Sequence, residues 1–209
     1  MRQNITMKKL GLFIGSALLC TLSFSQHTPK FGIKTGVNVA NFKTNTAEEY
    51  DSRIGFHGAL LSHIHLSREF ALQPEIQYSQ EGTKYNVNVN NSLNEVTTKL
   101  DYINLPIMLQ YMFNNGFRLE AGPQFGFLIN AKDDIEGIGE TERKTFYKST
   151  NVSVGLGANY LSYSGFGVGA RYNFGLSDIW EQTTADIKSR NLQISVFYML
   201  DNNHKAKSR

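Results

Sequence analysis

The sequence has 209 residues, enough for one domain with a sizeable core; 12% of them are aromatic and only 19% are charged. An ordinary soluble domain has fewer aromatic and more charged residues. Three basic residues precede position 26 and account for the formal net charge of +3, because the rest of the chain has 18 basic and 18 acidic residues. We therefore expect no nucleic-acid partner, since that kind of binding needs a basic face.

The N-terminus has the pattern of a secretory signal peptide. A basic start is followed by an apolar stretch over residues 10–22, which is short for a membrane-spanning helix. Ser23 and Ser25 supply small residues at the −3 and −1 positions, which predicts cleavage between Ser25 and Gln26. The only cysteine lies within this predicted signal peptide (residues 1–25), so we expect no disulfide in the mature chain. Lipidation of that cysteine is the less favoured alternative, because two leucines precede it.

Apolar and polar residues alternate with a period of two after residue 30. No stretch there approaches the 18 uninterrupted apolar residues of a membrane helix, so a membrane protein of this sequence has to be a closed β-barrel. The clearest alternation covers residues 117–130. In all, eight segments show it, approximately residues 31–43, 53–66, 70–83, 98–113, 117–130, 147–160, 166–176 and 188–200. Each is longer than the ~9–11 residues that a tilted strand needs to cross a bilayer.

The connections between these segments alternate between short and long. Three are short turns, whereas the longer ones, near residues 44–52, 84–97, 131–146 and 177–187, are polar. An even strand count with short turns on one side and long loops on the other is typical of outer-membrane barrels. We therefore predict an all-β fold, an eight-stranded antiparallel up-and-down transmembrane β-barrel over residues 26–200, with both termini in the periplasm. A polar tail is predicted over residues 201–209.

The charged residues decide which face of the strands meets lipid. The face that carries Arg118, Glu120 and Arg171 is expected to line the lumen, because an arginine at the bilayer midplane costs about 2–4 kcal/mol. The opposite face is apolar and has aromatic residues near the strand ends, as interfacial girdles require. A soluble lipocalin-like barrel, with the apolar face turned inward, is the alternative of a different class.

Four segments resemble the PorT-type outer-membrane β-barrel family, which is common in Bacteroidetes. The resemblance implies a Gram-negative source. These segments are Phe31–Asn38, Tyr102–Ile107, Glu120–Gly126 and Arg171–Ile179. The resemblance extends over essentially the whole mature chain and implies the barrel fold and the outer-membrane location. An accessory role in protein export is the functional hypothesis that the family's name adds.

Six polar side chains are predicted to form a network in the lumen: Lys34, Glu75, Arg118, Glu120, Gln124 and Arg171. An eight-stranded barrel is only wide enough to hold its own side chains, and buried charges must be paired. We favour a polar plug that closes the barrel. The alternative is a small-solute channel of the outer membrane with this network as its selectivity element.

The histidines are weaker candidates for a functional site. His63 and His65 share one face of a strand and could present two imidazoles to one metal ion, but no third ligand lies near them in sequence. His57 is the histidine that could serve a catalytic site at the outer rim of the barrel. However, no Gly-x-Ser-x-Gly nucleophile motif is present. We expect a non-enzymatic protein without a cofactor.

The predicted outer loops carry an acidic group of residues, Asp133, Asp134 and Glu136. This group suits weak cation binding or a surface partner, but a solvated loop beside anionic lipopolysaccharide is the favoured interpretation. Trp180, the sole tryptophan, is expected to anchor the barrel at the outer interface. The expected partners are outer-membrane lipid and lipopolysaccharide, the barrel-assembly machinery during biogenesis, and a protein that contacts the loops.

Overall fold

A computed structural model describes residues 28–44, 50–89, 92–137, 139–181 and 187–200. The predicted signal peptide with its cleavage site at Ser25 and Gln26, and the predicted tail over residues 201–209, lie outside these residues. No helix in the described part of the chain is long and apolar enough to cross a membrane.

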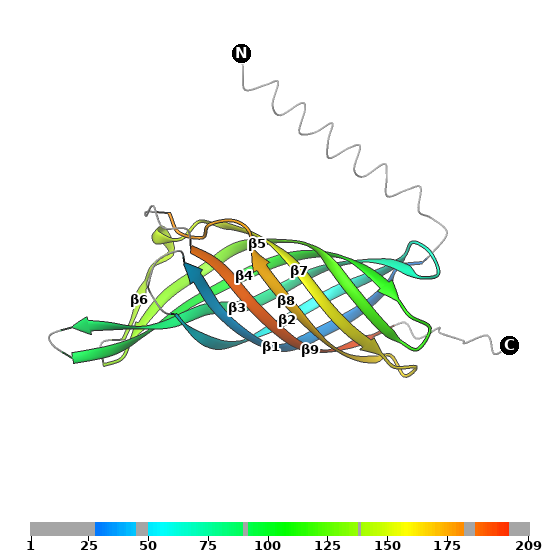
Figure 1. The fold of residues 1–209 in the computed structure, drawn as a ribbon, viewed down its shortest axis with the longest axis horizontal. Helices are drawn as coiled ribbons and strands as arrows, with labels where there is room; N and C mark the ends of the chain where they lie inside the picture. Colours follow the sequence, from blue (N-terminus) through cyan, green and yellow to red (C-terminus); the bar gives the residue numbers. More distant parts are fainter. Residues whose placement is uncertain (1–27, 45–49, 90–91, 138, 182–186, 201–209) are drawn as a thin grey trace, which may run out of the picture.

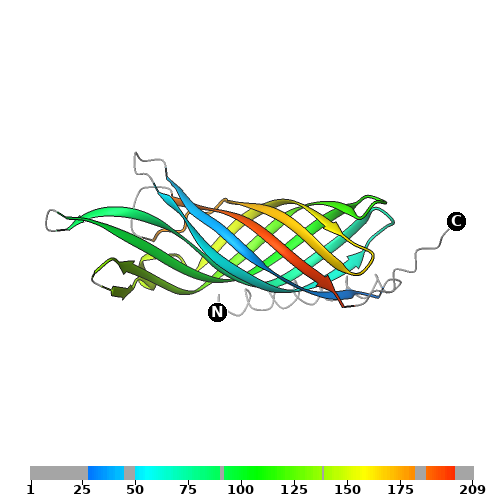
Figure 2. The same ribbon diagram turned by 90° about the horizontal axis from the view of Figure 1, so that it is seen from below.

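The predicted fold class is confirmed: antiparallel strands close into a ring (Figures 1 and 2). The strands are β1 (Lys30–Thr44), β2 (Asp51–His65), β3 (Phe70–Val89), β4 (Ser92–Met112), β5 (Phe117–Ile135), β6 (Gly139–Glu142), β7 (Thr150–Leu161), β8 (Phe166–Gly175) and β9 (Ile187–Met199). Each ring strand pairs with its neighbour in the chain, and β1 pairs with β9 to close the ring. The short strand β6 stands outside the ring and pairs only with the end of β5, so eight strands form the wall.

The two ends of the barrel differ, as the connection lengths predict. At one end, here the turn end, β2–β3, β4–β5 and β7–β8 are joined by short turns, and β1 begins and β9 finishes there. At the other end, here the loop end, the β3–β4 hairpin extends well beyond the ring (Figure 1). A 3₁₀ turn, η2 (Lys144–Phe146), lies in the connection from β6 to β7.

The outer surface of the ring is apolar. Large hydrophobic side chains alternate with buried polar ones along every ring strand, and many of them are half exposed, for example Ile194 at 53% and Val168 at 55%. Aromatic rings contact one another around the turn end, from Phe70 through Tyr111 to Phe113. A surface of this kind fits lipid, because a soluble monomer rarely exposes an apolar patch of this extent.

Apolar side chains also fill the two ends of the interior. The loop-end apolar cluster consists of Phe42, Leu100, Tyr102, Leu128, Ala131, Tyr147, Ile179 and Ile187. The turn-end apolar cluster consists of Leu61, Leu161, Phe197 and Met199. The Phe197 ring lies directly over Gly167, where an added Cβ would stand 2.1 Å from Cζ of the ring, so only glycine leaves room for it. The sequence reasoning expected a polar lumen and missed both clusters.

The predicted loops over residues 84–97 and 131–146 are wrong in part. Residues 84–89 and 92–97 continue the β3–β4 hairpin, and the second segment contains the end of β5, β6 and η2. The ladder continues beyond the apolar wall through polar cross-strand pairs, such as the Lys84–Glu95 ion pair at 2.7 Å. The alternation was present in part, because Tyr85, Val87 and Val89 alternate with polar residues, whereas residues 92–97 show no such pattern.

A β-bulge in β5 changes which side chains face inward. Asp101 of β4 pairs with Asn130, whereas Tyr102 pairs with Leu128, so Ile129 is the extra residue. Beyond this point the odd-numbered residues of β5 turn inward, although they face outward before it. The bulge therefore places Asp133 in the interior, at 5% exposure.

Replacing Ile194 by arginine tests the lipid-facing assignment. Ile194 lies mid-strand on β9 between Val37 and Ala170, so Ile194→Arg should lower the free energy of unfolding in phospholipid vesicles by about 2–4 kcal/mol. Asn88→Arg, in the exposed part of the β3–β4 hairpin, is the control and should change it by less than ~0.5 kcal/mol. The measurement is urea-induced unfolding, and equal effects of both changes would contradict the assignment.

Candidate functional site

The six side chains predicted for the lumen all lie on the inner face of the ring. Their exposures are 6% for Lys34, 3% for Glu75, 6% for Arg118, 4% for Glu120, 3% for Gln124 and 3% for Arg171. They come from β1, β3, β5 and β8, which are brought together only by ring closure. The period of two along each strand is what turns them inward.

Four of these residues, Lys34, Glu75, Glu120 and Arg171, form what we call the charge cluster. Arg171 makes a bidentate contact with Glu75, with Nη2–Oε1 at 2.7 Å and Nη1–Oε2 at 3.1 Å. Its Nε donates to Glu120 Oε1 at 2.6 Å, and Lys34 Nζ donates to Glu75 Oε1 at 2.5 Å. The fork of the guanidinium thus joins β3 to β5 across the interior.

Neutral amides complete the hydrogen bonding of the two carboxylates. Gln73 Nε2 donates to Glu75 Oε1 at 2.8 Å, and Gln110 Nε2 donates to Glu120 Oε2 at 3.0 Å. Two cations thus face two anions, and every carboxylate oxygen of the cluster accepts at least one hydrogen bond. Such pairing is what allows charges to be buried, because an uncompensated buried charge is strongly destabilising.

Two of the predicted residues do not take part in the charge cluster. Gln124 Oε1 is buried and has no hydrogen-bond partner. Within the described part of the chain, Arg118 has neither a hydrogen bond nor an ion pair, although Glu120 attracts it electrostatically. The sequence could place Arg118 on the inner face, but it could not show that the nearby carboxylates are already taken.

A second network, nearer the loop end, surrounds His57, which is fully buried. His57 Nε2 lies 2.9 Å from Ser195 Oγ, and its Nδ1 lies 2.8 Å from Asn38 Oδ1. These are the distances of a nucleophile, a base and an orienting group in a hydrolase. Ser195 itself is only 7% exposed, and His57 is fully buried. A groove on the outer face of β7, β8 and β9 includes Ser195 in its lining but not His57, so the two side chains do not face one shared cavity there.

Glu81 is an inward carboxyl that the sequence reasoning missed. It is 4% exposed and accepts hydrogen bonds at Oε1 from Ser79 at 3.0 Å and from Asn104 at 3.1 Å. It has no ion-pair partner among the described residues. The signal was available, because Glu81 has the same parity as Glu75 along β3.

The structure brings His63 and His65 together as neighbouring inward side chains near the turn end. Their ring centroids are 4.7 Å apart and the rings meet edge to face. Among the described residues, no three histidine, cysteine, aspartate or glutamate side chains are grouped so that they could hold a metal ion. The pair alone is a weak arrangement for a metal site.

The acidic residues expected in an outer loop are largely paired within β-structure. Asp133 accepts a hydrogen bond from Thr98 Oγ1 at 2.7 Å and lies 3.3 Å from Arg143 Nε. Asp134 pairs with Lys99 at 2.8 Å. Both residues therefore belong to β5 rather than to a loop, and Asp133 is buried, whereas the Asp134 side chain stays 40% exposed and Glu136 lies exposed beyond β5.

Asp178 holds the connection between β8 and β9 in place. Its carboxylate accepts hydrogen bonds from the backbone N–H groups of Trp180 at 3.2 Å and Ile187 at 3.1 Å, and from Lys148 Nζ at 2.9 Å. Partial burial raises the pKa of Asp178, but these hydrogen bonds outweigh it and hold the pKa below its ordinary value. Trp180 packs edge to face on Tyr147 at 4.8 Å, against the loop-end apolar cluster.

Comparison with known proteins agrees with this architecture. Residues 24–181 match the family model described as Outer membrane protein beta-barrel domain. The chain belongs to this family. It is accordingly a protein of the outer membrane, which the apolar outer face of the ring explains physically.

The chain is similar to solved structures, and Neisserial surface protein A shows the same fold. Neisserial surface protein A has a TM-score of 0.52 at 14% sequence identity, over 80% of this chain and 96% of that chain. Ail, the attachment invasion locus protein of Yersinia pestis, has a TM-score of 0.48 at 14% identity, over 81% and 97% of the two chains. At this identity the likeness is one of fold alone. No curated protein matches the sequence.

Removing one carboxylate from the charge cluster should destabilise the barrel strongly. Glu75→Ala leaves Lys34 and Arg171 without their shared partner in the interior, so the free energy of unfolding should fall by about 3–5 kcal/mol. Glu95→Ala is the matched control, because it breaks an exposed ion pair and should cost about 0–1 kcal/mol. Urea-induced unfolding measures both, and a loss below 1 kcal/mol for Glu75→Ala would contradict the pairing.

The Asp178 contacts should depend on pH. Since the folded pKa lies below the unfolded one, their stabilisation is complete above the unfolded value, about 3.9, and is lost as the pH falls through the folded pKa. At pH 7, Asp178→Asn should destabilise the local structure by about 1 kcal/mol, measured by the fluorescence of Trp180 during urea titration. At a pH below the folded pKa the two proteins should unfold at the same urea concentration; a constant difference would contradict the role of the charge.

Proposed function

We propose that this protein is a non-enzymatic outer-membrane barrel that is closed to solutes and acts structurally or through its surface loops. The observation that carries the proposal is that side chains fill the interior at successive levels, two of which are the charge cluster and the loop-end apolar cluster. The charge cluster crosses the ring in its turn-end half, and the loop-end apolar cluster crosses it further up. A route for water and ions would have to pass through both.

The two levels close the barrel by different means. In the loop-end apolar cluster, Leu100, Tyr102 and Ile179 are at most 1% exposed, so water has little access to this level. In the charge cluster, the Arg171 fork holds three strands together through ion pairs. Because a ring of eight strands has an interior only wide enough for side chains, neither level leaves much free space.

The loop end supports a role in contacts outside the membrane. The β3–β4 hairpin projects past the ring, and β6 forms a second projection with the end of β5 (Figures 1 and 2). We place this end at the cell surface and both termini in the periplasm, following the usual arrangement of long loops and short turns. Lys99 is paired with both Asp134 and Glu140, which makes the projection a structured surface beside lipopolysaccharide.

The absence of enzymatic activity and the role in protein export are separate parts of the proposal. The absence of enzymatic activity is supported by the burial of Ser195 and His57, whose distances would otherwise suit a hydrolase. An accessory role in protein export, as in the PorT-type family, is supported only by the four segments that resemble that family. We place a protein partner at the loop end whether or not the protein has a role in export.

Single-channel recording in planar bilayers tests the closed interior. The unmodified protein should show no conductance steps, and Tyr102→Ala should also remain silent, because the charge cluster still crosses the ring. The double variant Tyr102→Ala/Arg171→Ala should remain silent as well, because the His57 network and the turn-end apolar cluster still fill the interior.

Heat-modifiable migration on gels verifies that each variant is folded before it is recorded. Regular conductance steps from the unmodified protein would contradict the proposal and favour the small-solute channel. Conductance steps from a folded Tyr102→Ala variant would contradict the closing role of the charge cluster.

A further inference from the structure

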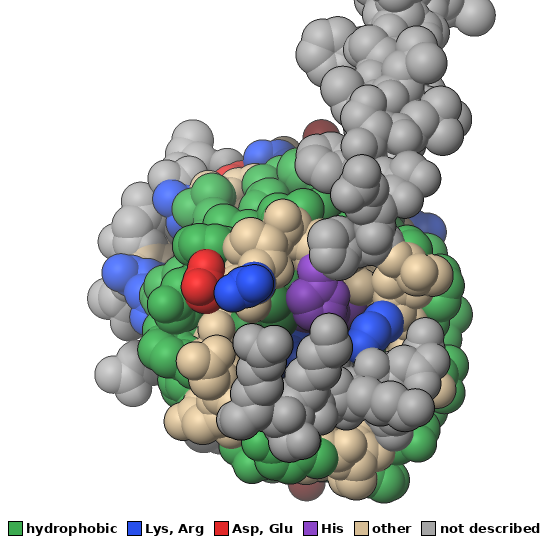
Figure 3. Space-filling model, turned by 90° about the vertical axis from the view of Figure 1, so that its right-hand side faces the viewer, with side chains coloured by type: hydrophobic (Ala, Val, Ile, Leu, Met, Phe, Trp, Pro, Cys, Tyr) green, Lys and Arg blue, Asp and Glu red, His purple; other side chains and the backbone are tan. Residues whose placement is uncertain are grey.

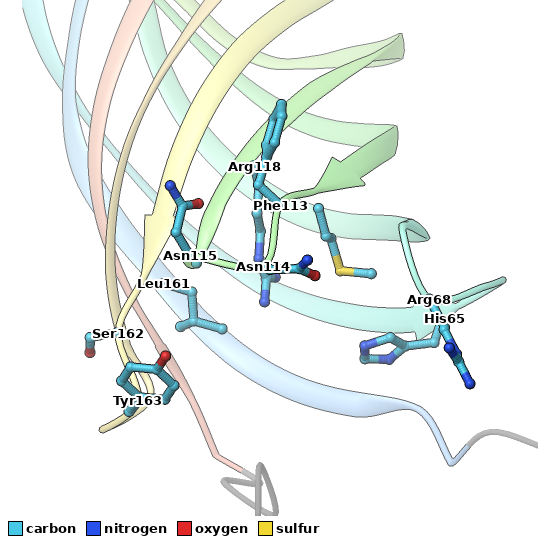
Figure 4. Close-up of a pocket in the computed structure, with 11 residues that line it drawn as sticks. His65, Arg68, Phe113, Asn114, Asn115, Arg118, Leu161, Ser162 and Tyr163 are labelled. Atoms are coloured by element: carbon cyan, nitrogen blue, oxygen red, sulfur yellow. The ribbon is translucent and has the colours of Figure 1, made fainter. Parts of the chain in front are cut away.

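A cavity of about 260 Å³ opens at the turn end of the barrel. Arg118 from β5, Arg68 and His65 from the β2–β3 turn region, and the Asn114–Gly116 turn contribute to its lining (Figure 4). On the same end, Figure 3 shows a histidine with basic side chains on either side of it, one of which lies beside an acidic side chain. We infer that this cavity is a binding site for an oxyanion, namely a phosphate group.

The position of Arg118 carries the inference. Its side chain lies on the inner face, the residue is 6% exposed, and it lines the cavity. In Figure 4 its guanidinium points toward the turn that carries Asn114. Within the described residues it donates no hydrogen bond and has no ion-pair partner. A guanidinium that lines a cavity and has no acceptor among the described residues can offer its five donors to an anion bound there.

Counting charges shows that the interior does not supply these acceptors. Lys34 and Arg171 balance Glu75 and Glu120, and both oxygens of Glu120 already accept hydrogen bonds, from Arg171 and Gln110. Arg118 is therefore one positive charge in excess at this end of the barrel. Glu81 does not neutralise it by contact, because its carboxylate is bonded to Ser79 and Asn104.

The lining as a whole suits an anion. Beside the two arginines and His65, it includes Asn114 and Tyr163, and none of its described residues is acidic; the Ser162 hydroxyl also lies in the lining but donates to the backbone oxygen of Phe166. Glu69 follows Arg68 in the turn but lies outside the lining. Arginine forks match the oxygens of phosphate bidentately, and the exposed Arg68 supplies a second one at the rim.

The size of the cavity limits what it can hold. Pockets for drug-sized ligands occupy about 300–1,000 Å³, so this cavity fits a headgroup-sized ligand rather than a larger molecule. The phosphate could come from two sources, a free phosphate of the periplasm or the headgroup of a phospholipid in the adjacent leaflet. Both present the same oxygens to Arg118.

Isothermal titration with inorganic phosphate tests the site in protein purified from outer membranes. In alkyl-glucoside micelles, which contain no phosphate, we expect saturable one-site binding. Arg118→Gln should weaken it roughly tenfold to a hundredfold, the loss expected from a charge-assisted hydrogen bond. Arg68→Gln, an exposed change that should not affect folding, should also weaken binding, and Lys84→Gln at the loop end should not, although it removes the same charge.

A second arm identifies the source of the phosphate. In nanodiscs of phosphatidylglycerol, titration with inorganic phosphate should show reduced binding if lipid headgroups occupy the cavity, and unchanged binding if the site takes free phosphate. Either result is consistent with an oxyanion site. No saturable binding in micelles, or equal binding by the unmodified protein and folded Arg68→Gln and Arg118→Gln variants, would overturn the inference.

Discussion

Ring closure between β1 and β9 is the constraint on which the rest of this structure depends. In lipid, each unpaired backbone group is costly, so a sheet can span the bilayer only if its two edge strands meet. The pairing of Gly32 with Met199 through Thr44 with Ile187 removes both edges. Once the ring is closed, the period of two along each strand divides every side chain between lipid and a narrow interior. The apolar outer face and the polar inner face are two consequences of the same closure.

Closure also explains why the interior charges must be arranged as they are. Lys34, Glu75, Glu120 and Arg171 come from four strands that are far apart in the sequence, and only the ring brings them within contact. Removed from water, each charge needs a partner and further hydrogen bonds. The Arg171 fork and the amides of Gln73 and Gln110 meet this need. The charge cluster thus joins strands across the interior and also closes it. Both effects result from the same ion pairs.

The sequence predicts whether a side chain faces inward where its odd or even position along the strand is sufficient. It does not predict features that depend on a contact partner or on a shift of strand register. The inward direction of Glu75, Arg118 and Arg171 follows from alternation alone, whereas the pairing of Arg171 with two particular carboxylates depends on strand tilt and register. The bulge at Ile129 inverts the parity of β5, so Asp133 could not be placed inside from the sequence. At the loop end, residues 92–97 of β4 show no apolar alternation, so the signal that marks a strand is missing there, whereas Tyr85, Val87 and Val89 of β3 did carry it. The apolar clusters at the two ends were missed because they interrupt an otherwise polar face over only a few residues.

The two ends of the barrel are unequal in charge as well as in shape. At the loop end, Lys84, Lys99 and Lys132 each have a carboxylate partner, so the projecting hairpins present paired charges to their surroundings. At the turn end, the charge cluster is internally balanced and Arg118 is left in excess at the mouth of a cavity. Among the described residues, none supplies this guanidinium with a hydrogen-bond acceptor. A ligand oxyanion would supply the missing acceptors, and this assigns chemistry to the turn end while the loop end provides surface for contact.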